Sequence, residues 1–385
     1  MRLAILVPGG VDRSGESRVI PAILSLLRRL ARRHDVQVFV PAQEPRPGTW
    51  RLLGSTVHNM GRSLGTVAGR VRLLQVLLRI HRRCPFDLFH AFWARGPGEV
   101  ALAAARICRR PVLVHVAGGE LVWLSAVSFG ARRRAIRSLA RFVVRHADCV
   151  TAASGAMLEA IARVGGRPVR LPLGVDTTVW IPEPPRPRPA DRPARLVSVG
   201  SLTPVKGHAT LLEAIARLTA AGWLVIADLV GEDTSNGAIP RLARTLGIAD
   251  RVICHGFLPQ REVVRVVRAA DVMVVASHHE AGPVAMLEAA AVGVPTVGTA
   301  VGHVRDWAPD AAIAVPAGDP AALAGAIADL LRDDARRLAV ARCAQELALR
   351  EDAEWTAARI EELYSTLVGR ADGRRVGRAA VVPKP

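Results

Sequence analysis

The apolar residues of this chain form short uninterrupted runs, and segments with helical spacing lie between the runs. In the first half the runs are residues 3–8, 36–40, 88–92, 112–116, 149–152 and 169–172. In the second half they are residues 196–199, 224–230, 252–255, 272–276, 296–298 and 312–315. Continuously apolar strands are typical of sheets that are covered on both faces, so the pattern predicts two parallel sheets flanked by helices, an α/β fold.

A proline-rich stretch separates the two series of strands. Residues 182–193 contain six prolines, which exclude a helix or a central strand and predict a semi-rigid linker. We therefore expect a first domain at residues 1–181 and a second at 194–350, both doubly wound and Rossmann-like. Two such domains would face each other across a cleft, because ligands of these sheets bind at the carboxyl ends of the strands.

The end of the chain differs from both domains. Helical spacing over residues 351–370 predicts a C-terminal helix that packs back on the first domain. Residues 371–385 are polar and basic, which predicts a flexible tail.

The composition limits the compartment in which this chain works. Half of its 385 residues are hydrophobic, which is enough for two cores. Its five cysteines lie far apart and form no CxxC pair, which favours free thiols in a reducing compartment. No uncharged run reaches about 18 residues, so no membrane-spanning helix is expected. The expected location is cytoplasmic, peripheral at the inner face of the cytoplasmic membrane.

The positive charge of the chain lies in its first half. Residues 1–180 hold 28 basic and 10 acidic side chains, whereas residues 181–385 hold 24 of each, so the first half carries the whole net charge of +18. This imbalance favours an anionic partner, either a membrane surface or a soluble anionic acceptor. Nucleic acid is not expected, because no stacking aromatic residues lie between the arginines.

Residues 121–145 are the candidate membrane segment. An apolar stretch at 121–129 precedes arginines at 134, 137, 141 and 145, which share one face of a predicted helix. Such a helix suits anionic lipid headgroups, and an ordinary domain helix with a solvated basic face is the alternative.

Two motifs in the second half carry candidate chemistry. Lys206 lies in the segment GSLTPVKGH, which follows a strand and opens a helix, a position suited to binding phosphate. Lys384 is the only other lysine, so this residue stands out in an arginine-rich chain. Further on, Glu280 precedes a Gly282-Pro283 turn and Glu288 follows inside an apolar helix. A proline at the first helical position leaves backbone N–H groups available for an anion, and hydroxyl groups would satisfy a buried Glu288.

These segments resemble the donor domain of the retaining nucleotide-sugar glycosyltransferases of glycosyltransferase family 4 (glycosyl transferases group 1), which have the GT-B fold. The family's G-R-L-x-x-x-K-G turn reads GSLTPVKG here, and its E-x7-E segment reads Glu280 to Glu288. The run PLGVD at 172–176 is similar to the family's domain-junction motif, and Val230-Gly231-Glu232 is similar to one of its loops.

The resemblance implies a role for each matching residue. Lys206 and the amides of the turn would bind the diphosphate, Glu280 the donor sugar and Glu288 the ribose. The implied donor-binding set is Gly10, Ser201, Lys206, Gly231, Glu280, Ala281, Gly282, Pro283, Val284 and Glu288. The implied acceptor side is Gly9, Gly10, Gly118, Gly119 and Glu120.

The sequence departs from the family pattern at two positions. The usual phosphate-binding arginine is replaced by Ser201, whose hydroxyl brings no charge. The usual histidine after the acceptor-domain strand is replaced by Ala117, and His115 lies two residues earlier. His115 is therefore a candidate catalytic residue beside Lys206 and Glu280, and a satisfied core histidine is the alternative reading.

The expected function is hexosyl transfer from a UDP- or GDP-sugar to a hydroxyl of a lipid-linked, polysaccharide or other glycan acceptor, with retention at the anomeric carbon. No permanently bound cofactor is expected. No metal is expected either, because the neighbouring His278 and His279 would point to opposite sides of an extended segment and lack a third ligand. The alternatives are a sugar-nucleotide epimerase or hydrolase, and a non-catalytic nucleotide-sugar-binding scaffold.

Overall fold

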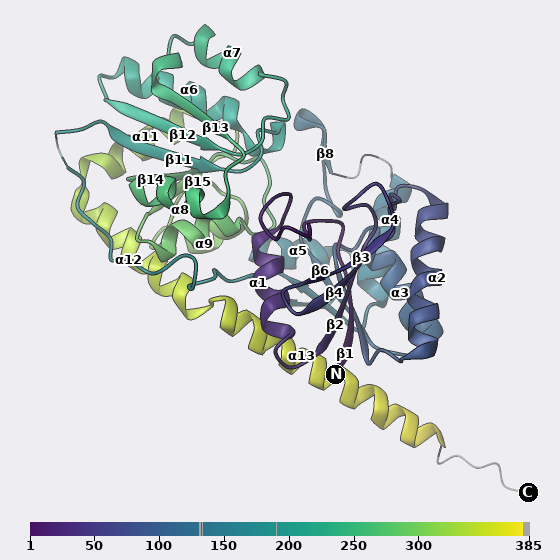
Figure 1. Cartoon of the computed structure of the whole chain (residues 1–385). Coiled ribbons are helices and arrows are strands. Elements are labelled where there is room, and N and C mark those ends of the chain that lie inside the picture. The colour runs from purple at the N-terminus through teal and green to yellow at the C-terminus, as the bar shows by residue number, and fades with distance from the viewer. Residues whose placement is uncertain (131, 133, 190, 380–385) are drawn as a thin grey trace, which may run out of the picture.

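Two separate sheets organise the chain, one in each half (Figure 1). The computed structural model describes residues 1–130, 132, 134–189 and 191–379. Both sheets are built mainly from parallel strands with helices on both faces, as predicted. The predicted α/β class with two Rossmann-like domains is confirmed.

The first sheet has the strand order β10-β9-β6-β5-β1-β2-β4-β3. Its strands are β1 (Arg2–Leu6), β2 (Asp35–Val40), β3 (Gly48–Leu52), β4 (Ser55–Asn59), β5 (Leu88–Phe92), β6 (Val112–Val116), β9 (Cys149–Ala152) and β10 (Pro168–Arg170). All neighbours pair in parallel except β3 and β4, which form an antiparallel hairpin at one edge.

The β3–β4 hairpin was not predicted from the sequence. Its strands alternate buried and more exposed residues, so they lack the continuous apolar runs that identified the central strands. Trp50 faces Val57 across the ladder, and both side chains are buried. Leu53 and Gly54 form the turn with φ of 50° and 85°, the two positive angles of the tight turn that suits strand twist.

Helices cover both faces of the first sheet. On one face lie α2 (Val67–Arg83), α3 (Pro97–Cys108), α4 (Arg134–His146) and α5 (Gly155–Arg163). The other face is covered by α1 (Pro21–Leu30) and by α13 (Ala353–Ala379), which returns from the end of the chain. Figure 1 shows α2, α3 and α4 on the side of the domain opposite to α1 and α13.

The second sheet has the order β13-β12-β11-β14-β15-β16. This is the doubly wound order, in which β12 and β13 follow on one side of β11 and β14, β15 and β16 follow on the other. Its strands are β11 (Ala194–Val199), β12 (Val225–Val230), β13 (Val252–Gly256), β14 (Val272–Val275), β15 (Thr296–Thr299) and β16 (Ile313–Val315). Helices α6 (His208–Ala220), α7 (Ala238–Thr245) and α11 (Pro320–Arg332) cover one face. Helices α8 (Gln260–Ala269), α9 (Val284–Ala291) and α12 (Asp334–Arg350) cover the other.

Helix α13 ties the end of the chain to the first domain. It contributes Ala357, Ile360, Tyr364 and Leu367 to the core beside α1, and the Tyr364 hydroxyl lies 2.6 Å from Nδ1 of the buried His90. The helix continues to Ala379. Residues 371–379, which were expected to form part of a flexible tail, are therefore helical. The remaining tail, 380–385, lies outside the described residues.

The segments between the domains contact both of them. Residues 181–189 form neither helix nor strand, and Gln345 of α12 donates to the backbone carbonyls of Glu183 and Ala291. On the other side of the junction, Arg170 makes a bidentate ion pair with Glu351 at 2.7 and 2.8 Å. Within the part of the chain that the structure describes, no helix is both long and apolar enough to cross a membrane.

Candidate active site

The loop that carries Lys206 is shaped by close backbone contacts. Residues 200–207 connect β11 to α6, and Gly207 immediately precedes the helix with a φ of 65°. A Cβ atom on Gly207 would lie 2.0 Å from the carbonyl oxygen of Ala276, at the end of β14. Only glycine therefore fits this position, and the contact holds the Lys206 loop against the segment that carries Glu280.

Lys206 and Glu280 meet at the carboxyl ends of β11 and β14. Lys206 Nζ lies 2.7 Å from Glu280 Oε1, and the Ser277 hydroxyl donates to the same oxygen at 2.7 Å. The two charged side chains are 30% and 12% exposed, so both remain accessible from a cavity while most of their length is covered. The structure thus brings together the two residues that two separate motifs predicted.

This cavity has a volume of about 180 Å³ and ends at the start of α9. Its lining includes Lys206, Ser277, Glu280, Gly282, Pro283 and Val284. Pro283 is the N-cap and not the first helical residue, which corrects the prediction by one position. No side chain caps α9, so its first backbone N–H groups are free to meet an anion at the cavity.

Sequence reasoning missed His208 and Ser198 in the same cavity. His208 is the first residue of α6 and is 2% exposed. Burial, together with the nearby charge of Lys206, lowers the pKa of His208 to about 4, so the imidazole is neutral. A histidine beside the Lys-Gly pair was the available signal, but the sequence alone did not place it in the cavity.

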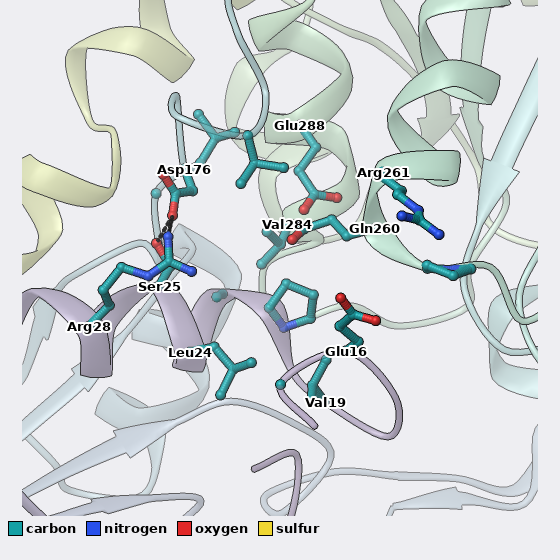
Figure 2. Close-up of a pocket in the computed structure, with 17 residues that line it drawn as sticks. Glu16, Val19, Leu24, Ser25, Arg28, Asp176, Gln260, Arg261, Val284 and Glu288 are labelled. Atoms are coloured by element: carbon teal, nitrogen blue, oxygen red, sulfur yellow. Dashed lines mark hydrogen bonds and ion pairs between the residues drawn. The ribbon is translucent and has the colours of Figure 1, made fainter. Parts of the chain in front are cut away.

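Glu288 lines a second cavity, between the two domains. This cavity is about 260 Å³ in volume, and Figure 2 shows Glu288, Gln260 and Val284 of the second domain opposite Glu16, Val19 and Leu24 of the first. Burial raises the pKa of Glu288 to about 7, although the Trp180 and Gln260 side chains oppose the rise. The carboxyl group is therefore poorly solvated and suited to hydroxyl donors from a ligand.

A charged cluster at the junction forms one wall of the interdomain cavity and was also missed. Asp176 accepts from Ser25 at 2.8 Å, and Arg28 lies 3.8 Å away (Figure 2). Arg29, behind this wall, donates to Asp176 at 3.1 Å. Burial would raise the pKa of Asp176, but hydrogen bonds from Arg29, Thr178 and Ser25 outweigh it and hold the pKa well below its usual range. The contacting residues lie about 150 positions apart, so spacing gave no signal.

The loop that carries Gly9 and Gly10, two residues of the implied binding sets, is fixed by a side chain that the sequence did not identify. Gln43 Oε1 accepts from the backbone N–H groups of Gly10 and Val11 at 2.8 and 3.2 Å. Gly10 has a φ of 81°, and a Cβ there would lie 2.4 Å from the Ile20 side chain. It is the later part of this loop, including Gly15 and Glu16, that lines the interdomain cavity, whereas Gly9 and Gly10 do not line it.

His115, a candidate catalytic residue from the sequence, is a core residue. It lies on β6, is 1% exposed, and its Nδ1 is 3.0 Å from the Thr151 hydroxyl on β9. Burial lowers the pKa of His115 to about 4. A neutral histidine with a partner inside the sheet is not exposed to a substrate in this structure, which favours the alternative of a satisfied core histidine.

Glu120, which the resemblance assigned to the acceptor side, is also buried, at 5% exposure. Its Oε1 accepts from the Ala94 N–H at 3.2 Å, and burial raises the pKa of the carboxyl while nearby backbone N–H groups oppose the rise. The side chain holds the turn that follows β6. Gly118, in the same turn, lies against Trp93: a Cβ atom on Gly118 would be 2.7 Å from the indole nitrogen.

The apolar stretch after this turn borders the second domain, and its expected contact with a membrane stays a prediction. It forms a small hairpin of β7 (Trp123–Leu124) and β8 (Phe129–Gly130). Phe129 lies over Gly119, and its ring centroid is 5.5 Å from that of His279, the neighbour of Glu280. The hairpin therefore borders the cleft, and Leu121 at the start of the stretch is buried.

The remaining predicted donor residues differ in their exposure and in what they contact. Ser201 is exposed and does not line either cavity. Gly231 packs against the Gly200 backbone, where a Cβ would be 2.2 Å from the Gly200 oxygen. Ala281 is buried, and Gly282 abuts Ala153 of the first domain, so this turn also forms part of the domain interface.

Side chains suited to a metal do not cluster in the part of the chain that the structure describes. Among the described residues, no group of three or more histidine, cysteine, aspartate or glutamate side chains is arranged to hold a metal ion. The five cysteines are free thiols.

Two family models match the chain, one in each domain. Residues 183–347 match the glycosyl transferases group 1, and residues 19–173 match a glycosyl transferase 4-like domain. One similar protein is the D-inositol 3-phosphate glycosyltransferase of Xylanimonas cellulosilytica, 30% identical over 254 residues, which are 60% of this chain and 60% of the relative. The match thus spans about three fifths of that relative's length.

Solved structures show the same fold. Sucrose-phosphate synthase from Thermosynechococcus elongatus aligns with a TM-score of 0.82 and 21% identity, over 96% of this chain and 100% of that one. The Anabaena protein HepE in complex with UDP-glucose aligns with a TM-score of 0.74 and 21% identity, over 95% and 100%. With both domains matched by glycosyltransferase models and the two-sheet architecture shared, the chain belongs to the group 1 glycosyltransferases and has their GT-B fold.

Proposed function

We propose that this protein transfers a hexose from a nucleotide diphosphate sugar to an acceptor hydroxyl. The observation that carries the proposal is the convergence of Lys206, Ser277 and Glu280 within 2.7 Å contacts at the uncapped start of α9. A diphosphate at this cavity would meet one cation and several backbone N–H groups. Glu288, in the adjoining cavity, would accept hydrogen bonds from ribose hydroxyls.

The chemistry of the leaving group explains why these residues would suffice. As the glycosidic bond breaks, negative charge develops on the departing diphosphate, and fixed donors aimed at that charge lower the barrier. Lys206 and the α9 amides supply such donors, so the proposed transfer uses no metal. In the structure Lys206 is held by Glu280, and a diphosphate would compete with Glu280 for it. Glu280 would then be available to hydrogen-bond the hydroxyls of the donor sugar.

The finer assignments are also proposals. The resemblance of Glu280–Glu288 and of the Lys206 loop to the family motifs supports retention at the anomeric carbon. The UDP-glucose complex of HepE supports a UDP-sugar as donor, with a GDP-sugar as the second candidate. The acceptor would be a lipid-linked, polysaccharide or other glycan. Its hydroxyl would approach from the first domain, beside the turn at Gly118 and Gly119. The proposed location is cytoplasmic, at the inner face of the cytoplasmic membrane.

Product analysis separates transfer from the alternatives. The protein would be incubated with UDP- and GDP-hexoses, with and without a glycan acceptor mixture, and the nucleotide and sugar products would be quantified. Transfer predicts nucleoside diphosphate release that rises strongly with acceptor, and a product whose anomeric configuration matches the donor by NMR. Equal release without acceptor would indicate a hydrolase, a changed nucleotide sugar an epimerase, and binding without turnover a scaffold.

A further inference from the structure

The outward surface formed by α2, α3 and α4 carries a dense excess of arginine. The three helices contain five, one and four arginines respectively, and Glu99 is their only acidic residue. Glu99 is buried and already pairs with Arg70 at 2.9 Å. Arg72, Arg79, Arg82, Arg83, Arg106 and Arg141 are all exposed, and none of these six forms an ion pair with another described residue.

The opposite face of the same domain provides an internal control for compositional bias. On α1 and the residues that follow it, Arg29 and Arg32 pair with Glu354 at 2.9 and 3.2 Å. Arg33 pairs with Glu361 at 3.0 Å. Both acids come from α13. A chain that was merely rich in arginine would leave both faces alike, so the scarcity of acids on α2–α4, where Glu99 is the single one, is specific to that surface.

Contacts between the helices make this a continuous surface. Arg106 of α3 donates to the backbone carbonyl of His146 at the end of α4. Burial raises the pKa of the Cys108 thiol at the end of α3, and the charges of Arg110 and of Arg82 on α2 are close enough to oppose that rise. The ends of the three helices therefore lie side by side.

Large apolar side chains are exposed among these arginines. Val67 and Val71 on α2 are 75% and 45% exposed, Ile107 on α3 is 58% exposed, and Phe142 on α4 is 51% exposed. Arginines alone would suit any soluble polyanion. Apolar side chains between them suit an interface at which headgroup phosphates lie next to hydrocarbon.

We propose that the α2–α3–α4 surface docks on an anionic lipid bilayer, with the arginines on headgroup phosphates and Phe142, Ile107 and the valines inserted between them. The surface lies on the side of the sheet away from α1 and α13. The residues that line the interdomain cavity include none from α2, α3 or α4, so docking here would leave that cavity uncovered. The inference rests on the proposed function only for the idea of a lipid-linked acceptor, because docking itself needs no turnover.

Vesicle flotation tests the proposal with matched variants. Vesicles of phosphatidylglycerol and phosphatidylcholine in equal parts should carry the protein at roughly 0.05 M NaCl and release it at roughly 0.5 M, where the Debye length is about 4 Å. Pure phosphatidylcholine vesicles should not carry it. The triple variant Arg72→Gln, Arg79→Gln, Arg82→Gln should bind about a hundredfold more weakly, at about fivefold per arginine. The triple variant Arg217→Gln, Arg244→Gln, Arg342→Gln removes the same charge from exposed positions of the second domain and should bind as the wild type does.

A second pair of variants tests how much the exposed apolar side chains contribute to vesicle binding. This test remains valid even if a triple variant does not fold. Phe142→Ser should weaken vesicle binding about tenfold, whereas Phe257→Ser, which removes a ring of similar exposure (54%) from the second domain, should leave it unchanged. Lys206→Ala should float like the wild type, so that loss of transfer and loss of docking are separate results.

Three results would overturn the proposal. The wild type could fail to float at low salt. The two triple variants could lose binding equally, which would show an effect of net charge alone. The wild type could bind soluble dextran sulfate while ignoring the vesicles, which would assign the surface to an anionic polymer.

Discussion

In the second domain, polar side chains at the carboxyl ends of the strands turn toward a cavity: Lys206 and Glu280 meet at 2.7 Å and both remain partly exposed. In the first domain, side chains at the same end of the sheet turn inward. His115 bonds to Thr151 inside the sheet, and Glu120 holds a backbone turn. The doubly wound topology therefore places residues near the cleft, but only the packing of each strand end decides whether they can meet a ligand.

The domains also use charge differently. In the second domain, arginines lie near acids, as in the bidentate pairs of Arg192 with Asp271 and Arg195 with Asp228. In the first domain, helices α2, α3 and α4 together hold ten arginines and a single acid, Glu99. We therefore propose that the second domain carries the chemistry and that the first has a role in surface binding. The following variants test that division.

Removing the cation of the second-domain cavity should have the largest effect. Lys206→Ala should lower kcat/KM at least about thirtyfold, equivalent to about 2 kcal/mol of transition-state stabilisation, because a donor to the leaving diphosphate is lost. Arg342→Ala, which removes an exposed cation from α12, is the control and should be neutral. Near-normal turnover in Lys206→Ala would contradict the assignment of the catalytic site to the second-domain cavity.

Replacing Glu288 should change the pH dependence of stability. Burial raises the pKa of Glu288 to about 7, so folding favours the protonated carboxyl. The contribution of this carboxyl to the free energy of unfolding is complete below about pH 4 and is lost as the pH rises through 7. Glu288→Gln should therefore match the wild type at pH 4 in urea unfolding but exceed it at pH 8 by about 2 kcal/mol, a value reduced for partial solvation. A constant difference at both pH values would contradict the buried-carboxyl account; the exposed Glu213→Gln is the control.

Glu280→Gln should separate turnover from binding. The change removes the charge that faces Lys206 and Ser277 but keeps the shape of the side chain. We expect kcat to fall about tenfold, or about 1.4 kcal/mol, while nucleoside diphosphate affinity stays the same or increases as Lys206 is released. Titration calorimetry and initial rates would measure the two quantities. A parallel loss of both would reassign Glu280 to phosphate or ribose binding.

His115→Asn should affect stability and leave catalysis intact. The substitution leaves the buried Thr151 hydroxyl with a poorer partner, at a cost of about 1 kcal/mol in the free energy of unfolding. Thermal unfolding and kcat/KM per folded molecule would be compared. A large fall in kcat/KM at unchanged stability would restore His115 as a catalytic residue and remove the contrast between the domains.

The second domain could be predicted well from sequence because its site lies in continuous motifs. The Lys206 loop and the Glu280–Glu288 segment each follow a recognisable apolar strand, and strands that are neighbours in the sheet bring the two loops together. The two parallel sheets could be predicted for the same reason, since their strands are apolar throughout.

The first domain was harder to predict because its decisive contacts join distant residues. Gln43 reaches Gly10 across 33 positions, and Ser25 reaches Asp176 across 151. The hairpin β3–β4 alternates in polarity and gave no continuous run. Whether His115 faced the cleft depended on its register beside Thr151. A shift of one residue moves a side chain to the other face of the strand, and the sequence does not distinguish the two faces when both are buried.

The most direct test of the central claim is the binding of UDP, GDP and ADP to the wild type and to Lys206→Ala, measured by titration calorimetry and by the shift in melting temperature. We predict that at least one of the three raises the melting temperature of the wild type in proportion to its affinity, and that Lys206→Ala loses about thirtyfold of that affinity. Equal binding by both proteins, or no binding of any diphosphate by the wild type, would contradict the assignment of this cavity to the donor.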